Sequence, residues 1–376
     1  MRVAIIHYWL VGMRGGERVL EEMLRLYPQA DIFTHVADPA ALSDLIRARP
    51  ITETRIARLP GARRHYQKYL GFMPRALEEL DLRGYDLILS SESGPSKGIL
   101  PPPGSVHVCY THSPMRYVWD HYPDYRDRIR GPLGRAYFAH LAHRLRIWDV
   151  STAARVDRFV ANSQFVADRI RRYYHRAADV VHPPVDLGAY RPAARPRARD
   201  YYLFVSELVR YKRADIVIDA FRGLDRKLVV VGSGSERAAL ERGLPGNVTL
   251  LGRVPFDDLP GLYQGARALI FPAEEDFGIV PVEAMACGTP VLAYGRGGAR
   301  DSVVPGRTGF FFDQQSPAAV RAAVRDFEAR DPLDAAAIAR HAEGFGAERF
   351  RRELAEVIAT AFAERAVRDG GGGRAW

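Results

Sequence analysis

Two glutamates, Glu275 and Glu283, lie eight positions apart in the stretch FPAEEDFGIVPVEAMACGTPVLAYGRGG, residues 271–298. The letters DFG, directly after Glu275, are typical of a loop, whereas IVPVEAMA is typical of the first turns of a helix. We therefore predict one carboxylate on a loop and the other inside a helix. Backbone amides without helical partners would lie between them. Other parts of the sequence have to indicate which ligand these groups bind.

Three basic residues, Arg210, Lys212 and Arg213, lie just before another predicted helix in the stretch VSELVRYKRADIVIDAF. Positive charges at a helix start oppose the helix dipole unless an anion lies between them. The cluster therefore favours a bound phosphate over a solvated run of charges.

Glycines follow the first apolar run of the chain, where GMRGGERVL places Gly15 and Gly16 at a helix start. Such a start can bind an anion through its amides, or it can be a plain tight turn. The stretches VVVGSGSE (229–236) and LLGRVP (250–255, with Arg253) are similar strand ends. None of them by itself decides between ligand binding and a turn.

A histidine, His112, follows the apolar run VHVCYT and is itself followed by Pro114, which stops a strand. The imidazole either caps the strand or contacts a ligand. Arg116, Trp119 and Asp120 nearby favour a polar, aromatic surface. The sequence contains no D-x-D, no Cys/His cluster with metal-ligand spacing and no G-x-S-x-G, so we expect neither a metal nor a cofactor.

Short apolar runs alternate with amphipathic helical patterns along nearly the whole chain, which predicts the α/β class with parallel sheets covered on both faces. Two such series in tandem predict two doubly wound domains, at 1–188 and 189–345. A Pro- and Arg-rich linker is expected at 187–200, a final helix at 346–366, and a flexible Gly-rich tail at 367–376.

The net charge is +9, and residues 1–188 carry 27 Lys and Arg against 20 Asp and Glu. This imbalance favours anionic partners such as phosphates or an acidic membrane face. Charge alone also suggests nucleic acid, but the arginines are spread over amphipathic helical patterns, which does not support it. Two separated cysteines and the lack of a long apolar run predict a cytoplasmic protein with reduced thiols.

Taken together, these stretches resemble the retaining nucleotide-sugar glycosyltransferases of family 4, which have the GT-B fold. The resemblance covers nearly the whole chain. Its most specific part is EDFGIVPVEAMACGTPV, which looks like the family's E-x7-E motif followed by small residues. CYTHSPMRYVWD and VSELVRYKRADIVIDAF are similar to bacterial mannosyltransferases of polysaccharide and O-antigen assembly.

The resemblance implies two Rossmann-like domains facing a cleft and a metal-independent transfer of a sugar to a glycan or lipid-linked acceptor. GDP-mannose is the implied donor, and a UDP or dTDP sugar is the alternative. A GT-B sugar-phosphate synthase or phosphorylase and a non-catalytic nucleotide-sugar binder also remain open.

The same resemblance assigns the two glutamates to different parts of one ligand. Glu283 would hold the ribose hydroxyls, and Glu275 a hydroxyl of the donor sugar. The amides of Phe277, Gly278 and Ile279 would face the sugar and the diphosphate.

The leaving diphosphate would be stabilised by Lys212, helped by Arg213 and Gly16, while His112 would orient the donor sugar. The chain departs from the family in one place, because Glu207 stands where an arginine usually precedes the lysine. A carboxylate repels a diphosphate. We therefore expect Arg210 or Arg213 to supply the second positive charge.

Basic and apolar residues are interleaved in RIARLPGARRHYQKYLGFMPRAL, residues 55–77. This composition suits a segment at the membrane interface, where cations meet anionic lipids and rings meet the headgroups. It predicts a peripheral contact with the inner face of the plasma membrane. The alternative is that the apolar residues only pack against the N-terminal sheet.

Overall fold

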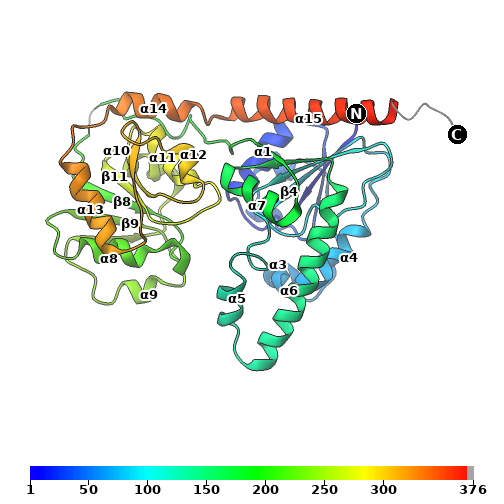
Figure 1. Cartoon of the computed structure of the whole chain (residues 1–376), viewed down its shortest axis with the longest axis horizontal. Helices are drawn as coiled ribbons and strands as arrows, with labels where there is room; N and C mark the ends of the chain where they lie inside the picture. The colour runs from blue at the N-terminus through cyan, green and yellow to red at the C-terminus, as the bar shows by residue number, and fades with distance from the viewer. Residues whose placement is uncertain (196, 371–376) are drawn as a thin grey trace. The chain divides into compact units, whose positions relative to one another are not determined.

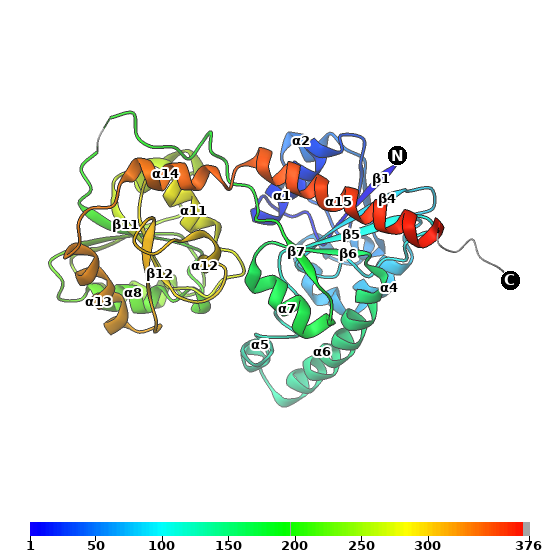
Figure 2. The same cartoon turned by 45° about the horizontal axis from the view of Figure 1, so that its top comes forward.

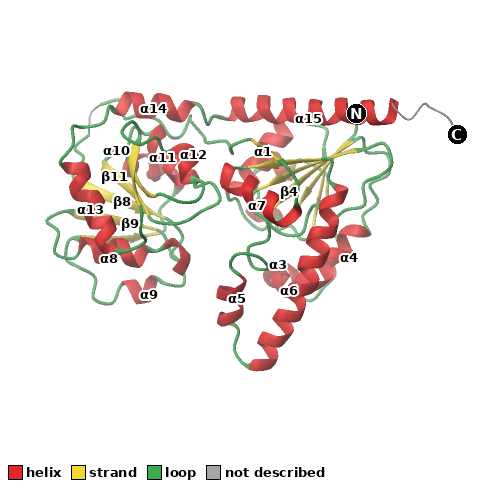
Figure 3. Cartoon of the chain, in the orientation of Figure 1, coloured by secondary structure: helices red, strands yellow, loops and turns green. Residues whose placement is uncertain are grey.

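The computed structural model describes residues 1–195 and 197–370 and divides into two compact units. Unit 1 comprises Met1–Pro183 and the chain from Phe350 onward, and unit 2 comprises Pro184–Arg349. Each unit contains its own parallel sheet between helices (Figure 1, Figure 3). The predicted α/β class with two doubly wound Rossmann-like domains is confirmed.

The sheet of unit 1 has seven parallel strands in the order β3-β2-β1-β4-β5-β6-β7. The elements of unit 1 are β1 (Val3–His7), α1 (Gly15–Leu26), β2 (Asp31–Thr34), η1 (Pro39–Ala41), α2 (Asp44–Arg47), β3 (Ile51–Glu53), η2 (Arg55–Arg58), α3 (Ala62–His65), η3 (Tyr66–Phe72), α4 (Met73–Glu78), β4 (Leu87–Glu92), β5 (Val106–Thr111), α5 (Tyr122–Arg128), α6 (Pro132–Thr152), η4 (Ala153–Arg155), β6 (Arg158–Ala161), α7 (Gln164–Tyr174) and β7 (Ala178–Val180).

The sheet of unit 2 has six parallel strands in the order β10-β9-β8-β11-β12-β13. The elements of unit 2 are β8 (Tyr201–Val205), η5 (Arg210–Lys212), α8 (Ala214–Phe221), β9 (Lys227–Val231), α9 (Arg237–Leu240), β10 (Val248–Gly252), η6 (Phe256–Asp258), α10 (Leu259–Gln264), β11 (Ala266–Phe271), α11 (Ile279–Ala286), β12 (Val291–Tyr294), α12 (Ala299–Ser302), β13 (Gly309–Phe312), α13 (Pro317–Glu328) and α14 (Ala335–Glu343).

The last helix, α15 (Ala347–Gly370), completes the core of unit 1. The helix runs beside α1 (Figure 2). Its Phe350, Leu354 and Ile358 are buried in the same cluster as Leu20 and Met23 of α1. The helix continues through residues 367–370, which belong to the predicted tail. Residues 371–376 of that tail, and residue 196 of the predicted linker, lie outside the described residues.

In both sheets the chain reverses its direction of travel beside the first strand. From β1 it moves outward to β2 and β3 and then returns to place β4 on the other side of β1. Unit 2 repeats this with β8, β9, β10 and then β11. The loops diverge at these switch points, so the carboxyl ends of β1 and β4, and of β8 and β11, are where open α/β sheets bind ligands.

The basic stretch 55–77 forms no single amphipathic helix but passes through η2, α3, η3 and α4. Its Ile56, Ala62 and Met73 are buried in a small core, while its basic side chains and Phe72 are exposed. Among the described residues, no helix combines the length and apolar character that crossing a bilayer requires.

Candidate active site

Lys212 and Glu275 form an ion pair at the switch point of unit 2. Lys212 follows β8, Glu275 follows the neighbouring strand β11, and the Lys212 Nζ lies 2.5 Å from the Glu275 Oε1. The two side chains are 13% and 19% exposed, so solvent or a ligand can reach them. The structure thus joins two predicted site residues that lie 63 positions apart in the chain.

The loop that carries Glu275 is fixed from behind by the loop after β12. The Gly298 amide donates a hydrogen bond of 2.8 Å to the Glu275 carbonyl. A Cβ at Gly298 would lie only 2.2 Å from the Asp276 carbonyl oxygen, so only glycine permits this approach. The backbone around Glu275 is therefore positioned by packing.

Helix α11 begins at Ile279, so Glu275 lies on the loop and Glu283 inside the helix, as the sequence predicts. Gly278 has φ +83° at the N-cap, a conformation that glycine adopts without strain. The amides of Phe277, Gly278 and Ile279 stand at the positive end of the helix dipole, although the Phe277 ring is buried in the core.

The Glu283 carboxylate accepts a hydrogen bond of 2.9 Å from the hydroxyl of Tyr263 on α10. Burial, together with the Glu283 charge, raises the pKa of Tyr263 well above its usual value, so its hydroxyl stays a donor. This contact orients Glu283 and leaves the carboxylate with further acceptor capacity. Sequence reasoning missed Tyr263, which reads as one more apolar position of a helix.

The remaining basic residues of the prediction differ in their surroundings. The Arg213 guanidinium pairs with Asp215 at 3.1 Å, and its backbone has φ +57°. Arg210 and Arg253 are exposed, and no ion pair joins either of them to another described side chain. Glu207 is exposed too, so its carboxylate is largely screened by water.

In unit 1, His112 follows the carboxyl end of β5, which is separated from β1 and its glycine turn by β4. Its Nε2 lies 2.8 Å from the Ser91 hydroxyl, and its amide donates to the Glu92 carbonyl at 2.8 Å. Gly15 and Gly16 begin α1 directly after the β1 loop, as predicted. Polar contacts of both its side chain and its backbone therefore fix the position of His112.

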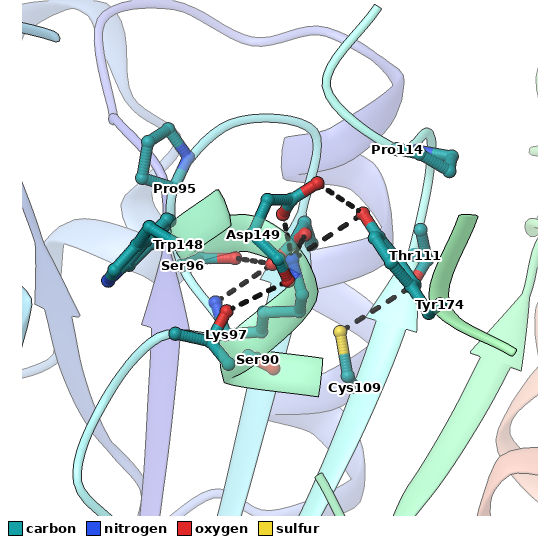
Figure 4. A network of polar contacts seen from close by, with 12 residues as sticks. Ser90, Pro95, Ser96, Lys97, Cys109, Thr111, Pro114, Trp148, Asp149 and Tyr174 are labelled. Atoms are coloured by element: carbon teal, nitrogen blue, oxygen red, sulfur yellow. Dashed lines mark hydrogen bonds and ion pairs between the residues drawn. The ribbon is translucent and has the colours of Figure 1, made fainter. Parts of the chain in front are cut away.

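Unit 1 also contains a buried charged network that sequence reasoning missed (Figure 4). The Lys97 ammonium contacts Glu92 at 2.8 Å and also Asp149, and all three side chains are at most 1% exposed. Asp149 also accepts hydrogen bonds from the hydroxyl of Tyr174 and, at 2.8 Å, from the indole of Trp119. Trp119 belongs to the segment that begins at His112, so the network anchors that segment.

The network sets the charges of its members. Burial alone would lower the pKa of Lys97, but Asp149 and Glu92 raise it above its usual value, and the ammonium stays charged. Burial, with a contribution from Asp149, raises the pKa of Glu92 although Lys97 opposes this. One cation is thus shared between two buried carboxylates.

Two family models match consecutive parts of the chain. The model described as "Glycosyltransferase Family 4" matches residues 13–189, and the model described as "Glycosyl transferases group 1" matches residues 191–343. The chain is a GT-B glycosyltransferase of the group 1 and family 4 type. Its Lys212–Glu275 pair lies in the group 1 part, and His112 lies in the family 4 part.

Curated relatives of this glycosyltransferase include D-inositol 3-phosphate glycosyltransferases. The protein from Streptomyces avermitilis is 29% identical over 73% of this chain and 74% of its own length. The protein from Salinispora tropica is 32% identical over 59% of this chain and 55% of its own length. The chain thus matches between about half and three quarters of these relatives.

Solved structures share the fold of this glycosyltransferase at low sequence identity. HepE from Anabaena in complex with UDP has a TM-score of 0.71 and 17% identity, covering 96% of this chain and 100% of that one. Sucrose-phosphate synthase from Thermosynechococcus elongatus has a TM-score of 0.71 and 18% identity, covering 97% and 100%.

The Lys97 network makes a testable prediction about stability. Lys97→Ala leaves two carboxylates buried without their cation, which we expect to lower the free energy of unfolding by about 3–5 kcal/mol. Urea denaturation followed by tryptophan fluorescence measures this, because Trp119 and Trp148 lie beside the network. The matched control is Lys68→Ala, an exposed lysine of the same unit, with an expected change below about 0.5 kcal/mol. Equal midpoints for the two variants would contradict a stabilising network.

Proposed function

We propose that this glycosyltransferase moves a sugar from a nucleotide sugar to a glycan or lipid-linked saccharide with retention of anomeric configuration. The observation that carries the proposal is the Lys212–Glu275 pair at the switch point of unit 2. A cation, a carboxylate and a helix N-terminus meet there, and Glu283 lies eight positions further along. A diphosphate, a sugar and a ribose need these groups.

Lys212 would exchange its partner when the donor binds. Its ammonium now contacts one carboxylate and is partly exposed, so a diphosphate can take over the contact. The negative charge that grows on the leaving diphosphate is then stabilised by a fixed cation and by the amides at the start of α11. Glu275, released from Lys212, can accept a hydrogen bond from a sugar hydroxyl.

Arg210 is a better second cation for the diphosphate than Arg213. The guanidinium of Arg213 is already engaged by Asp215, whereas no described carboxylate pairs with Arg210. Arg210 also lies in the same 3-10 turn as Lys212. Arg210 therefore compensates for Glu207, which stands where the family usually has an arginine.

GDP-mannose is the proposed donor, because residues 109–120 and 205–221 resemble the corresponding stretches of mannosyltransferases. A UDP sugar is the second candidate, because structures of similar fold contain UDP and UDP-glucose. Thermal melting with GDP-mannose, UDP-glucose and dTDP-glucose tests the choice, since stabilisation follows affinity for the folded state. A shift with UDP-glucose and none with GDP-mannose selects the second candidate. Transfer assays with glycan acceptors and D-inositol 3-phosphate then test catalysis. Binding of the donor without transfer would favour a non-catalytic nucleotide-sugar binder.

Lys212→Ala should lower turnover at least about a hundredfold, the scale for losing one transition-state charge donor. Activity of the unmodified protein should persist in EDTA. Lys227→Ala is the matched control, because this lysine of the same unit forms an exposed ion pair with Asp200. Equal turnover of the two variants, or strict dependence on added magnesium, would argue against this role of Lys212.

The two glutamates should differ in what their loss impairs. Glu275→Ala should weaken binding of the nucleotide sugar and leave binding of the free nucleoside diphosphate nearly unchanged. Glu283→Ala should weaken both, because the ribose is common to both ligands. Titration calorimetry on the two variants measures this difference, and identical losses for both ligands would refute the division of roles.

A peripheral membrane contact through residues 55–77 belongs to the same proposal. Arg58, Arg64 and Lys68 are exposed and form no ion pair within the described structure, while Phe72 is 63% exposed. Leu70 packs against the same buried cluster as Leu141 of α6. The first part of α6 adds two exposed apolar side chains, Leu133 and Tyr137.

Each basic side chain near an anionic bilayer contributes roughly 1 kcal/mol. The protein should therefore sediment with anionic vesicles at low salt and be released at high salt. Replacing Arg58, Arg64 and Lys68 together by alanine should abolish sedimentation, whereas Lys227→Ala should not. Protein that remains in the supernatant at low salt, or that pellets equally with neutral vesicles, would disprove the contact.

A further inference from the structure

Unit 2 contains a cavity of about 650 Å³ that neither Lys212 nor Glu275 lines. Its lining includes Arg296, Arg300, Val303, Pro305, Phe311 and Asp313. Arg296 lies just after β12 and Asp313 just after β13, so the cavity is at the carboxyl ends of these two strands. Open α/β sheets bind ligands at this edge, and the volume is in the range of small-ligand sites. The chemistry of the lining indicates which ligand it suits.

Two cations face the cavity without a carboxylate partner. Arg296 and Arg300 both line it, and both side chains are exposed. Within the described part of the chain, no ion pair engages either guanidinium, whereas Arg237 of the same unit pairs with Glu241 at 2.7 Å. Guanidinium groups bind phosphate and carboxylate through two parallel hydrogen bonds. The cavity therefore offers two cations to an anionic group.

A carboxylate in the same lining narrows the class of ligand. Asp313 lines the cavity, yet it forms no ion pair with Arg296 or Arg300. A carboxylate repels a small anion, so it does not suit a site for inorganic phosphate alone. It does accept hydrogen bonds from hydroxyl groups. The lining therefore suits a ligand that carries both an anionic group and hydroxyls.

The rest of the lining is apolar and belongs to the folded core. Val303 is only 3% exposed and lies in the main hydrophobic cluster of unit 2, and Phe311 packs against that cluster. Pro305 completes this side of the cavity. A sugar ring has C–H groups on its faces and hydroxyls at its edge, so it can contact an apolar wall while its hydroxyls reach polar groups. A wall of this kind with a few polar groups is typical of ligand sites.

The backbone that carries the two arginines is fixed by the loop of Glu275. Between them, Gly297 has φ +72°, and a Cβ there would lie only 2.6 Å from the Glu275 carbonyl oxygen. Arg296 directly precedes this turn, and Arg300 is on α12, which directly follows it. Packing therefore holds the backbone of both cations before a ligand arrives, which lowers the cost of binding.

We infer that this cavity is a second binding site, for a saccharide unit that carries a phosphate or carboxylate group. Arg296 and Arg300 bind the anionic group, and Asp313 accepts hydrogen bonds from hydroxyls of the sugar. The apolar wall contacts the face of the ring. That this unit belongs to the glycan acceptor rests on the proposed function. The binding of an anionic saccharide does not.

Binding of small probes to the full-length protein is the first test. Glucose 6-phosphate and glucuronate represent the two anionic groups, while glucose and inorganic phosphate each lack one half of the ligand. Titration calorimetry should give a Kd for at least one anionic sugar that is at least about tenfold lower than those of glucose and phosphate. The tighter of the two anionic sugars identifies the group that the arginines bind. If neither binds more tightly than glucose and phosphate, the inference is wrong.

Variants locate the binding site of that probe. Replacing Arg296 and Arg300 together by alanine should weaken its binding at least about tenfold, because two charged hydrogen-bond donors are lost. Both side chains are exposed, so the melting temperature should stay unchanged. Arg307→Ala is the matched control, since this exposed arginine precedes β13 but lies outside the lining. Lys212→Ala should change the Kd by less than about twofold. A loss with either single variant as large as that of the double variant would overturn the assignment.

Asp313→Asn tests whether the site recognises a saccharide or only an anion. Loss of the negative charge should leave phosphate binding equal or tighter, whereas the advantage of the anionic sugar over phosphate should shrink at least about threefold. An undiminished advantage would contradict a site for a saccharide. The transfer assay is independent of these titrations. If no sugar is transferred while the double variant loses the probe, the proposed function fails and the second site stands.

Discussion

The order of the strands is the constraint on which every candidate site residue depends. In each unit the chain starts in the middle of a parallel sheet, fills one side and then crosses to the other. The loops after the two central strands leave in opposite directions and expose the carboxyl ends of those strands. Lys212 and Glu275 follow one such pair of strands. His7 ends β1, and its partner Ser91 lies one residue before the end of β4.

Sequence could predict those parts of the site that are local. The division of Glu275 and Glu283 between a loop and a helix follows from about a dozen residues with a clear change of pattern, and the helix begins where that pattern places it. Most strands can be predicted equally well, because a strand that is buried on both faces has a continuous run of apolar residues in the sequence. Strand β3 forms no such run, because its three residues lie at the sheet edge and are not buried.

The parts that sequence could not predict depend on pairing between distant strands. Nothing local in AIIHYW or LILSSES shows that His7 and Ser91 face each other, because that needs the order and register of β1 and β4. The same holds for Lys97 and Asp149, which lie 52 positions apart. A residue close in sequence can also change a prediction. Arg213 was expected to bind phosphate, but Asp215, only two positions away, pairs with its guanidinium.

Lys97 and Lys212 show how burial separates a structural cation from one available to a ligand. Both ammonium groups contact carboxylates at the carboxyl ends of central strands. Lys97 is 1% exposed and shared between two carboxylates, so exchanging a partner would leave a buried charge uncompensated. Lys212 is 13% exposed and has one carboxylate partner, itself 19% exposed, so water can solvate both groups during an exchange. The same pair of residue types therefore fixes the backbone around His112 in unit 1 and leaves a replaceable anion contact in unit 2.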